Sequence, residues 1–182
     1  MSTYTINVSF QTRVNKTTRT LEIAESFGLG LDEKDWTLYD NLELEVEQGD
    51  VVYITGQSGS GKSVVLRELQ RQMKDEGLSV ASIDDFTFDN DVNVIDQLGK
   101  TTSEALGLLS MAGLNDAYLF VRKPSEMSDG QKYRLKIAKL IESGAKVWAA
   151  DEFGAVLDRV TAQVVASNLQ RAARKVGATV MV

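Results

Sequence analysis

Apolar and polar residues alternate in two stretches near the start of the chain, residues 3–10 and residues 37–46. Alternation with a period of two is typical of strands that bury one face and expose the other. Between these stretches, residues 19–29 are expected to form a short helix. The residues of this helix expected to face inward are Leu21, Ala24, Phe27 and Leu29. We therefore predict a small antiparallel β-layer over residues 1–50.

The pattern changes after residue 50, where short apolar runs alternate with longer segments of helical period. The apolar runs cover residues 51–55, 78–83, 146–150 and 178–182. The helical segments cover residues 62–76, 104–112, 129–142 and 158–175. Such alternation is typical of a mostly parallel sheet flanked by helices. We predict an α/β fold in one domain, with a core of residues 51–83 and 146–182 and a helical subdomain of residues 84–145.

A glycine-rich loop joins the first apolar run to the first helix. Its sequence is G-x-x-x-x-G-K-S, the phosphate-binding loop of P-loop NTPases. The glycines let main-chain N–H groups approach an anion, and the start of the helix adds partial positive charge. Lys62 is expected to reach the outer phosphates, and the hydroxyl of Ser63 is expected to bind Mg²⁺. The residues predicted to bind ATP here are Gly56, Gln57, Ser58, Gly59, Ser60, Gly61, Lys62 and Ser63.

Two adjacent carboxylates, Asp151 and Glu152, follow the third apolar run. In P-loop NTPases, a strand beside the phosphate loop ends in an aspartate that holds Mg²⁺, and Asp151 suits that role. Glu152 could polarise the attacking water as a general base. The structural alternative is an acidic cap on an ordinary loop. The position of the pair after an apolar strand favours the catalytic interpretation.

A third motif, Ser128-Asp129-Gly130-Gln131, stands at the start of the helix over residues 129–142. Taken alone it is an ordinary helix N-cap with a turn. Because it lies between the phosphate loop and the acidic pair, we interpret it as a donor set for an anion. A run of basic residues follows on this helix, and it is either a solvated surface or a contact for phosphate or a partner. The basic residues are Lys132, Arg134, Lys136 and Lys139.

With these three motifs in this order, residues 36–182 resemble the ABC-type ATPases. The third motif is similar to the family signature, ordinarily Leu-Ser-Gly-Gly-Gln, with Asp129 in place of a glycine. The resemblance implies ATP hydrolysis in a head-to-tail homodimer that holds nucleotide between its subunits. It implies that three residues of one subunit cap the γ-phosphate held by the other. These residues are Ser128, Gly130 and Gln131.

Other positions are interpreted through the same resemblance. Asp158 belongs to the short loop that would run across the dimer, and Phe153 stands where proline is usual. Trp36 lies near the place of the family's adenine-stacking aromatic, with Tyr39 as a rival and a core tryptophan as the structural alternative. The usual glutamine after the second core strand is missing, so Asp84 or Asp85 could contact the metal or water instead.

Two features bear on the whole protein. The family carries a γ-phosphate-sensing histidine after its last strand, and this chain ends at Val182, so we interpret it as a truncated domain with slow or absent turnover. Residues 20–32 and 52–56 are similar to a group in which an ABC-type ATPase is fused to a predicted acetyltransferase domain. A soluble ATPase module of a larger protein is the preferred setting. The alternatives are a transporter's nucleotide-binding subunit and a DNA-repair or chromosome-maintenance ATPase.

Composition narrows these alternatives. The 182 residues carry a net charge of −6, which makes nucleic acid an unexpected partner. The sequence has no cysteine, so disulfides and thiolate metal sites are excluded, and it has no histidine, so any imidazole that a mechanism needs must come from outside this chain. We see no apolar run long enough to span a membrane and no secretory signal, and we expect a cytoplasmic protein. Only about 65 residues, without sustained heptads, separate Lys62 from Ser128, which argues against a coiled-coil insertion typical of chromosome-maintenance ATPases.

Overall fold

The computed structural model describes residues 2–182, and these residues divide into two compact units. The smaller unit comprises Thr3–Glu45, and the larger unit comprises Ser2 and Val46–Val182. Each unit has its own sheet, so the two are described separately.

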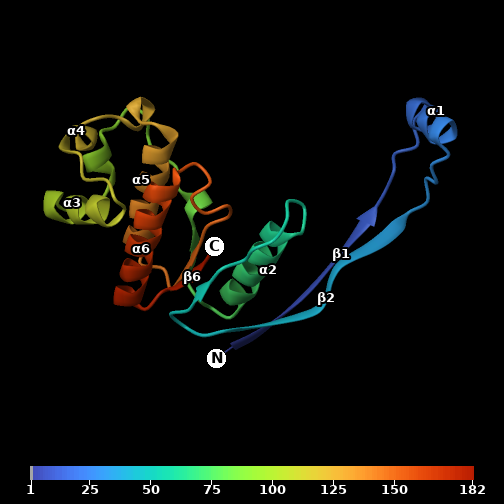
Figure 1. Ribbon diagram of the computed structural model, residues 1–182, viewed down its shortest axis with the longest axis horizontal. Helices are drawn as coiled ribbons and strands as arrows, with labels where there is room; N and C mark the ends of the chain where they lie inside the picture. The colour runs from blue at the N-terminus through green and yellow to red at the C-terminus, as the bar shows by residue number, and fades with distance from the viewer. Residues whose placement is uncertain (1) are drawn as a thin grey trace. The chain divides into compact units, whose positions relative to one another are not determined.

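The smaller unit is a two-stranded sheet with a helix in the connection between its strands (Figure 1). Strand β1 covers Ser2–Thr12, helix α1 covers Thr18–Phe27, and strand β2 covers Lys34–Val46. The strands are antiparallel, because Thr12 Oγ1 donates to Lys34 O at 3.0 Å while Asn41 N donates to Asn7 Oδ1 at 2.6 Å. This confirms the predicted antiparallel layer.

Helix α1 forms as predicted and ends at Gly28, which has the left-handed φ of 63°. The predicted inward face is wrong in most positions. Of the four residues expected inside, only Ala24 is buried, and Phe27 is 73% exposed. The other two, Leu21 and Leu29, are also exposed. A two-stranded sheet offers a connecting helix little surface to pack against.

The larger unit contains a four-stranded parallel sheet, as the sequence predicted. Its strands are β3 (Val51–Val52), β4 (Val80–Ser82), β5 (Val147–Ala149) and β6 (Thr179–Met181). The strand order is β3-β6-β5-β4, so β6 pairs with both β3 and β5. The strand that precedes the acidic pair, β5, is therefore separated from β3 by one strand. The segment at the end of the sequence forms the strand between them.

Five helices are described in the larger unit between Val46 and Val182. They are α2 (Lys62–Asp75), α3 (Thr102–Met111), α4 (Ala117–Phe120), α5 (Asp129–Glu142) and α6 (Arg159–Val176). Helices α5 and α6 lie side by side and both contribute to the main core (Figure 1). The centre of this core includes Leu109, Leu135, Trp148 and Leu169. Helix α4 was not predicted, because four residues are too few to show a helical period.

The exposed side of α2 carries a local ion-pair network around Glu68. Arg71 Nη2 donates to Glu68 Oε1 at 2.6 Å, and Gln72 Nε2 donates to the same oxygen at 2.9 Å. The hydrogen bond from Arg71 is the main cause that lowers the pKa of Glu68 to about 2. The ionised form of Glu68 is therefore favoured in the folded state.

This shift predicts a pH-dependent effect of Glu68→Gln. A lowered folded-state pKa stabilises the fold above the unfolded value near 4.5, and this stabilisation is lost as the pH falls toward 2. We expect Glu68→Gln to lower the Tm at pH 7 by about 1–2 °C, because the pair is near the surface. The difference from wild type should vanish near pH 2. Thermal melts of both proteins from pH 2 to 7 measure this, with the exposed Glu25→Gln on α1 as a matched control. A difference that persists unchanged at pH 2 contradicts the assignment.

Candidate functional site

The predicted phosphate loop connects the extended continuation of β3 to the first residue of α2. Gly61 is the N-cap of α2 and has a φ of 88°, which side-chain-bearing residues rarely adopt. A Cβ atom placed on Gly56 would lie 2.7 Å from Ser60 Oγ, which is too close for a real contact. The predicted order of strand, glycine-rich loop and helix is confirmed. The backbone of Gly61 requires glycine, whereas a side chain at Gly56 would require the Ser60 hydroxyl to move.

Lys62 folds back over this loop. Its Nζ atom donates hydrogen bonds to Gly56 O at 3.0 Å and to Gln57 O at 2.9 Å. The ammonium group therefore sits against the loop's main chain at the start of α2, where the helix dipole adds partial positive charge. Residues 56–60 are exposed, so the loop faces solvent. This arrangement suits an anion.

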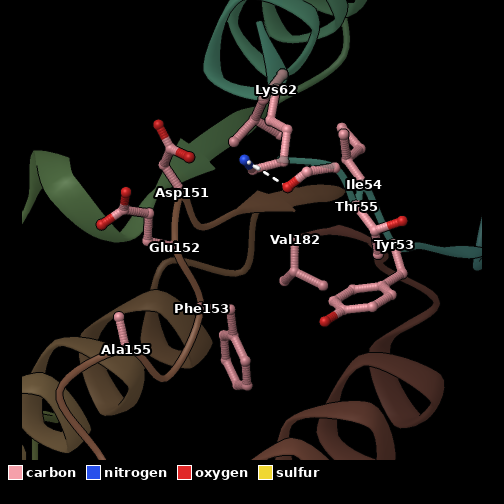
Figure 2. Close-up of a pocket in the computed structure, with 11 residues that line it drawn as sticks. Tyr53, Ile54, Thr55, Lys62, Asp151, Glu152, Phe153, Ala155 and Val182 are labelled. Atoms are coloured by element: carbon pink, nitrogen blue, oxygen red, sulfur yellow. Dashed lines mark hydrogen bonds between the residues drawn. The ribbon is translucent and has the colours of Figure 1, made fainter. Parts of the chain in front are cut away.

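The loop borders a pocket of about 270 Å³ that also contains the acidic pair (Figure 2). Lys62 from the start of α2 and Asp151 and Glu152 from the segment after β5 contribute its charged side chains. The full lining is Tyr53, Ile54, Thr55, Gly56, Lys62, Leu66, Asp151, Glu152, Phe153, Ala155 and Val182. Sequence reasoning anticipated the charged members. It did not anticipate that Val182, at the end of β6, would line the pocket between them.

The segment after β5 forms a tight turn. Glu152 has a φ of 51°, and Ala155 N donates to Glu152 O at 3.0 Å. Gly154 N donates to the hydroxyl of Tyr133 on α5 at 3.0 Å. Sequence reasoning missed Tyr133. The only signal was an aromatic residue between two basic ones in the first turns of a helix.

The third motif caps α5 as its local reading predicted. Ser128 N donates to Gln131 Oε1 at 2.9 Å, and Gln131 N donates to Ser128 Oγ at 3.4 Å, which makes a reciprocal capping box. A Cβ atom on Gly130 would lie 3.3 Å from Leu157 Cδ2, so this glycine lies close to the loop after β5. Among the described residues, none of the motif's members lines the 270 Å³ pocket.

Asp158 is the N-cap of α6. Its Oδ1 atom accepts hydrogen bonds from Val160 N and Thr161 N, both at 3.0 Å. The hydrogen bond from the Thr161 side chain is the largest of the causes that lower the pKa of the Asp158 carboxyl. Asp158 thus has a local structural role whether or not it meets a second subunit.

The remaining candidate residues are also engaged locally. Asp85 Oδ2 accepts a hydrogen bond from Ser82 N at 3.1 Å, so this carboxylate caps the turn after β4. In the basic run, Arg134 donates to Gly113 O at 2.9 Å, and Lys139 donates to Gln97 O and pairs with Glu142, both at 2.7 Å. Two of the four basic side chains are therefore bound within the fold. They do not form one free cationic face.

Magnesium fits the residues at the pocket, with nucleotide phosphates completing the coordination. No group of three acidic or other metal-binding side chains gathers at one place within residues 2–182. Mg²⁺ bound with a nucleotide usually takes only one or two carboxylates and relies on phosphate and water oxygens. Asp151, which lines the pocket, supplies an oxygen donor of this kind, whereas Ser63, the second residue of α2, is not among the residues that line it. No helix among the described residues is long and apolar enough to cross a membrane.

The fold of this chain has a solved structural neighbour among the ATP-binding cassettes. The fold is similar to the dimeric, post-hydrolysis structure of the ATP-binding cassette MJ0796 bound to ADP and Pi, with a TM-score of 0.69 and 19% identity. That match covers 99% of this chain and 86% of the other. It confirms the predicted α/β architecture of a parallel sheet flanked by helices with a small antiparallel subdomain.

Curated relatives include methionine import ATP-binding proteins. The chain is 27% identical to MetN 2 of Oceanobacillus iheyensis, over 83% of this chain and 54% of that protein. It is 29% identical to MetN 1 of Burkholderia lata, over 78% of this chain and 50% of that protein. The chain therefore spans about half the length of the curated relatives it matches.

The residues of the candidate site lie within the segment of the chain that matches a known protein family. The family described as ABC transporter matches residues 39–155, a segment that includes the phosphate loop, the third motif and the acidic pair. The ATPase class predicted from the sequence agrees with this match, because the ATP-binding cassettes of the family are ATP-hydrolysing. Since the matched segment is well over half of the sequence, the chain belongs to the ABC transporter family.

Proposed function

We propose that this chain binds ATP–Mg²⁺ and hydrolyses it. The observation that carries the proposal is the convergence of Lys62, Asp151 and Glu152 on one pocket beside an exposed phosphate loop. A volume of about 270 Å³ is just below the usual range for ligand sites, so it suits only the phosphate end of a nucleotide. The nucleoside would extend beyond it.

Each residue has a chemical role in this proposal. Main-chain N–H groups of residues 56–63 and the Lys62 ammonium bind the phosphates. Ser63 and Asp151 hold Mg²⁺, which offsets the charge that develops on the transferred phosphoryl group. The Glu152 carboxylate accepts a proton from the attacking water and orients it toward the terminal phosphate. Lys62 already lies against the loop, so little reorganisation is needed when the phosphates bind.

A second copy of the chain would complete the site. The exposed loop leaves one side of a bound triphosphate in water. We propose that Ser128, Gly130 and Gln131 of a second subunit close that side, with Asp158 near the crossing loop. The capping box orders the N-terminus of α5 and occupies the N–H groups of Ser128 and Gln131, so the Ser128 hydroxyl and the Gln131 side-chain amide are the donors proposed for the phosphate. Closure would make dimerisation depend on the bound nucleotide.

The nucleoside end is assigned by the same reasoning. Trp36 is 55% exposed and stacks on Phe10 with ring centroids 6.0 Å apart, so one ring face is supported by a neighbour. Tyr39 is only half-buried and remains the rival. We propose Trp36 as the adenine contact, since an exposed and supported aromatic face suits base stacking. Asp84 remains the candidate substitute for the missing glutamine, because Asp85 is occupied as a cap.

Two settings for this ATPase remain. The first is a soluble cytoplasmic module of a larger protein, with an acetyltransferase-like domain as the proposed fused partner. The second is the nucleotide-binding subunit of an importer. The import ATP-binding proteins among the relatives favour it, as does a groove of about 580 Å³ in the helical segment between residues 95 and 121. A nucleic-acid partner is disfavoured by the net charge of −6 and by the internal bonds of Arg134 and Lys139.

Titration calorimetry with ATP, with and without Mg²⁺, tests the core of the proposal. We expect saturable heat with one ATP per chain and a large loss of affinity when EDTA removes the metal. Phosphate release should depend on Mg²⁺ in the same samples. A folded protein that gives no heat with ATP–Mg²⁺ would falsify the proposed function. The setting is tested separately in the native host, where the mass of the purified native protein shows a fused domain and co-purification shows a membrane partner.

Asp129 provides a prediction about the proposed dimer. It is the first residue of α5, so its carboxylate would face the partner's nucleotide phosphates. Two like charges about 4 Å apart in water repel by about 1 kcal/mol. Because the proposed homodimer has two such contacts, we expect Asp129→Asn to strengthen ATP-dependent self-association by about 2 kcal/mol, or roughly 30-fold, as measured by sedimentation velocity. The Tm should fall slightly, by about 1–2 °C, because an acidic residue in the first turn stabilises the helix.

The opposite signs of these two effects make the test specific. A mutation that merely loosened α5 would weaken association and stability together. Asp116→Asn at the N-cap of α4 is a control that also removes a helix-terminal carboxylate. Unchanged association of Asp129→Asn in a protein that still binds ATP would argue against α5 meeting the nucleotide.

A further inference from the structure

Tyr133 of α5 contacts the loop that carries Glu152 in two ways. The Tyr133 hydroxyl accepts a hydrogen bond from Gly154 N at 3.0 Å. The Tyr133 ring also meets the Phe153 ring edge to face, with centroids 6.1 Å apart and an interplanar angle of 67°. Two consecutive loop residues are thus held by one side chain, one through its backbone and one through its ring.

The conformation held in this way is strained. Glu152 is one of only two non-glycine residues between residues 2 and 182 with a positive φ, and its φ is 51°. Such conformations persist only when the surrounding structure enforces them. The next positive φ belongs to Gly154, at 74°. These two residues reverse the chain so that Phe153 points away from the two carboxylates (Figure 2).

The hydrogen bond to Tyr133 is well protected. Gly154 is buried, so its N–H would lack a water partner if the hydroxyl were removed. Burial is also the largest cause that raises the pKa of Tyr133 to about 12. Asp84, in the turn after β4, adds a smaller contribution in the same direction. The phenol therefore stays neutral at physiological pH, and the hydrogen bond does not depend on pH there.

We propose that Tyr133 is a positioning residue, whose hydroxyl fixes the turn of residues 152–155 and so keeps the Glu152 carboxylate in the pocket. The effect on rate rests on the proposed function, whereas the effect on the turn does not. The same helix carries Ser128 and Gly130, and a Cβ atom on Gly130 would lie 3.3 Å from Leu157 in this loop. Within one subunit, Tyr133 links the helix proposed to meet the partner's nucleotide to the proposed general base.

Tyr133→Phe removes the hydroxyl and keeps the ring that contacts Phe153. We expect hydrogen exchange of the Gly154 amide to accelerate about tenfold, as for the loss of one buried hydrogen bond. The ¹³Cα chemical shift of Glu152 should move toward that of a residue with negative φ. The single-turnover rate of ATP hydrolysis should fall about tenfold, while the Kd for ATP changes less than twofold. A purely structural role would not separate the rate from the affinity.

Tyr118→Phe is the matched control, because Tyr118 lies on α4 and is 76% exposed. It should change neither the exchange of Gly154 nor the rate. The positioning role is overturned if Tyr133→Phe leaves Gly154 exchange unchanged, or if exchange accelerates without a change in rate. If the wild-type chain neither binds nor hydrolyses ATP, the proposed function fails. The exchange and chemical-shift measurements then still decide whether Tyr133 fixes the turn.

Discussion

Replacing Glu152 by glutamine should lower the single-turnover rate of ATP hydrolysis about 1,000-fold, within the range for loss of a general base. The Kd for ATP should stay within about threefold of wild type, because the phosphates are bound by other groups. The glutamine side chain has the same length and shape as that of glutamate. The substitution therefore leaves the strained φ of 51° and its cost in place and removes only the proton acceptor.

The measurement uses enzyme in excess over labelled ATP, so that even a slow turnover is resolved. Since Glu152→Gln binds ATP without consuming it, the ATP-bound dimer should accumulate and be visible by sedimentation. Glu45→Gln, an exposed carboxylate on β2, is the control for removal of one surface charge. A Glu152→Gln protein that hydrolyses ATP at more than a tenth of the wild-type rate would show that another group activates the water.

The parts of the fold that the sequence predicted are those set by local chemistry. The phosphate loop is the clearest example, since Gly61 adopts a left-handed φ that favours glycine. Helix α5 over Asp129–Glu142 agrees with the predicted range, because a capping box starts it and its apolar period is strong. Both features depend on residues within a few positions of one another.

The parts that could not be predicted depend on contacts between distant segments. The place of β6 between β3 and β5 is decided by pairing of residues about 30 and 130 positions away, and strand order leaves no local trace. The exposure of Phe27 depends on the small size of its unit, whose two-stranded sheet offers α1 little surface to pack against. The hydrogen bond between Gly154 N and the Tyr133 hydroxyl joins residues 21 positions apart, and neither residue type predicts it. The sequence predicted the charged side chains of the candidate site, Lys62, Asp151 and Glu152, but it did not predict the turn that orients Glu152.

Replacing Lys62 by alanine should weaken ATP binding roughly 100-fold, because a hydrogen bond between charged groups contributes about 1.5–3 kcal/mol. Lys62 has two roles that the substitution removes together. It is the pocket's only cationic side chain among the described residues, and its Nζ atom also donates hydrogen bonds to Gly56 O and Gln57 O. Loss of affinity could therefore come from lost charge or from a loosened loop.

Lys62→Gln separates these two effects. A glutamine side chain can still donate a hydrogen bond to a loop carbonyl, so it can still help to order the loop, but it carries no charge. If charge dominates, Lys62→Gln and Lys62→Ala should lose similar affinity for ATP, and both should bind ADP with a smaller loss than ATP. If loop order dominates, Lys62→Gln should recover most of the affinity. Calorimetry with both nucleotides at two salt concentrations decides, since a charge effect weakens as ionic strength rises while a loop effect does not. Wild-type affinity in Lys62→Ala would mean that the phosphates bind elsewhere, and the pocket beside Asp151 would then have another ligand.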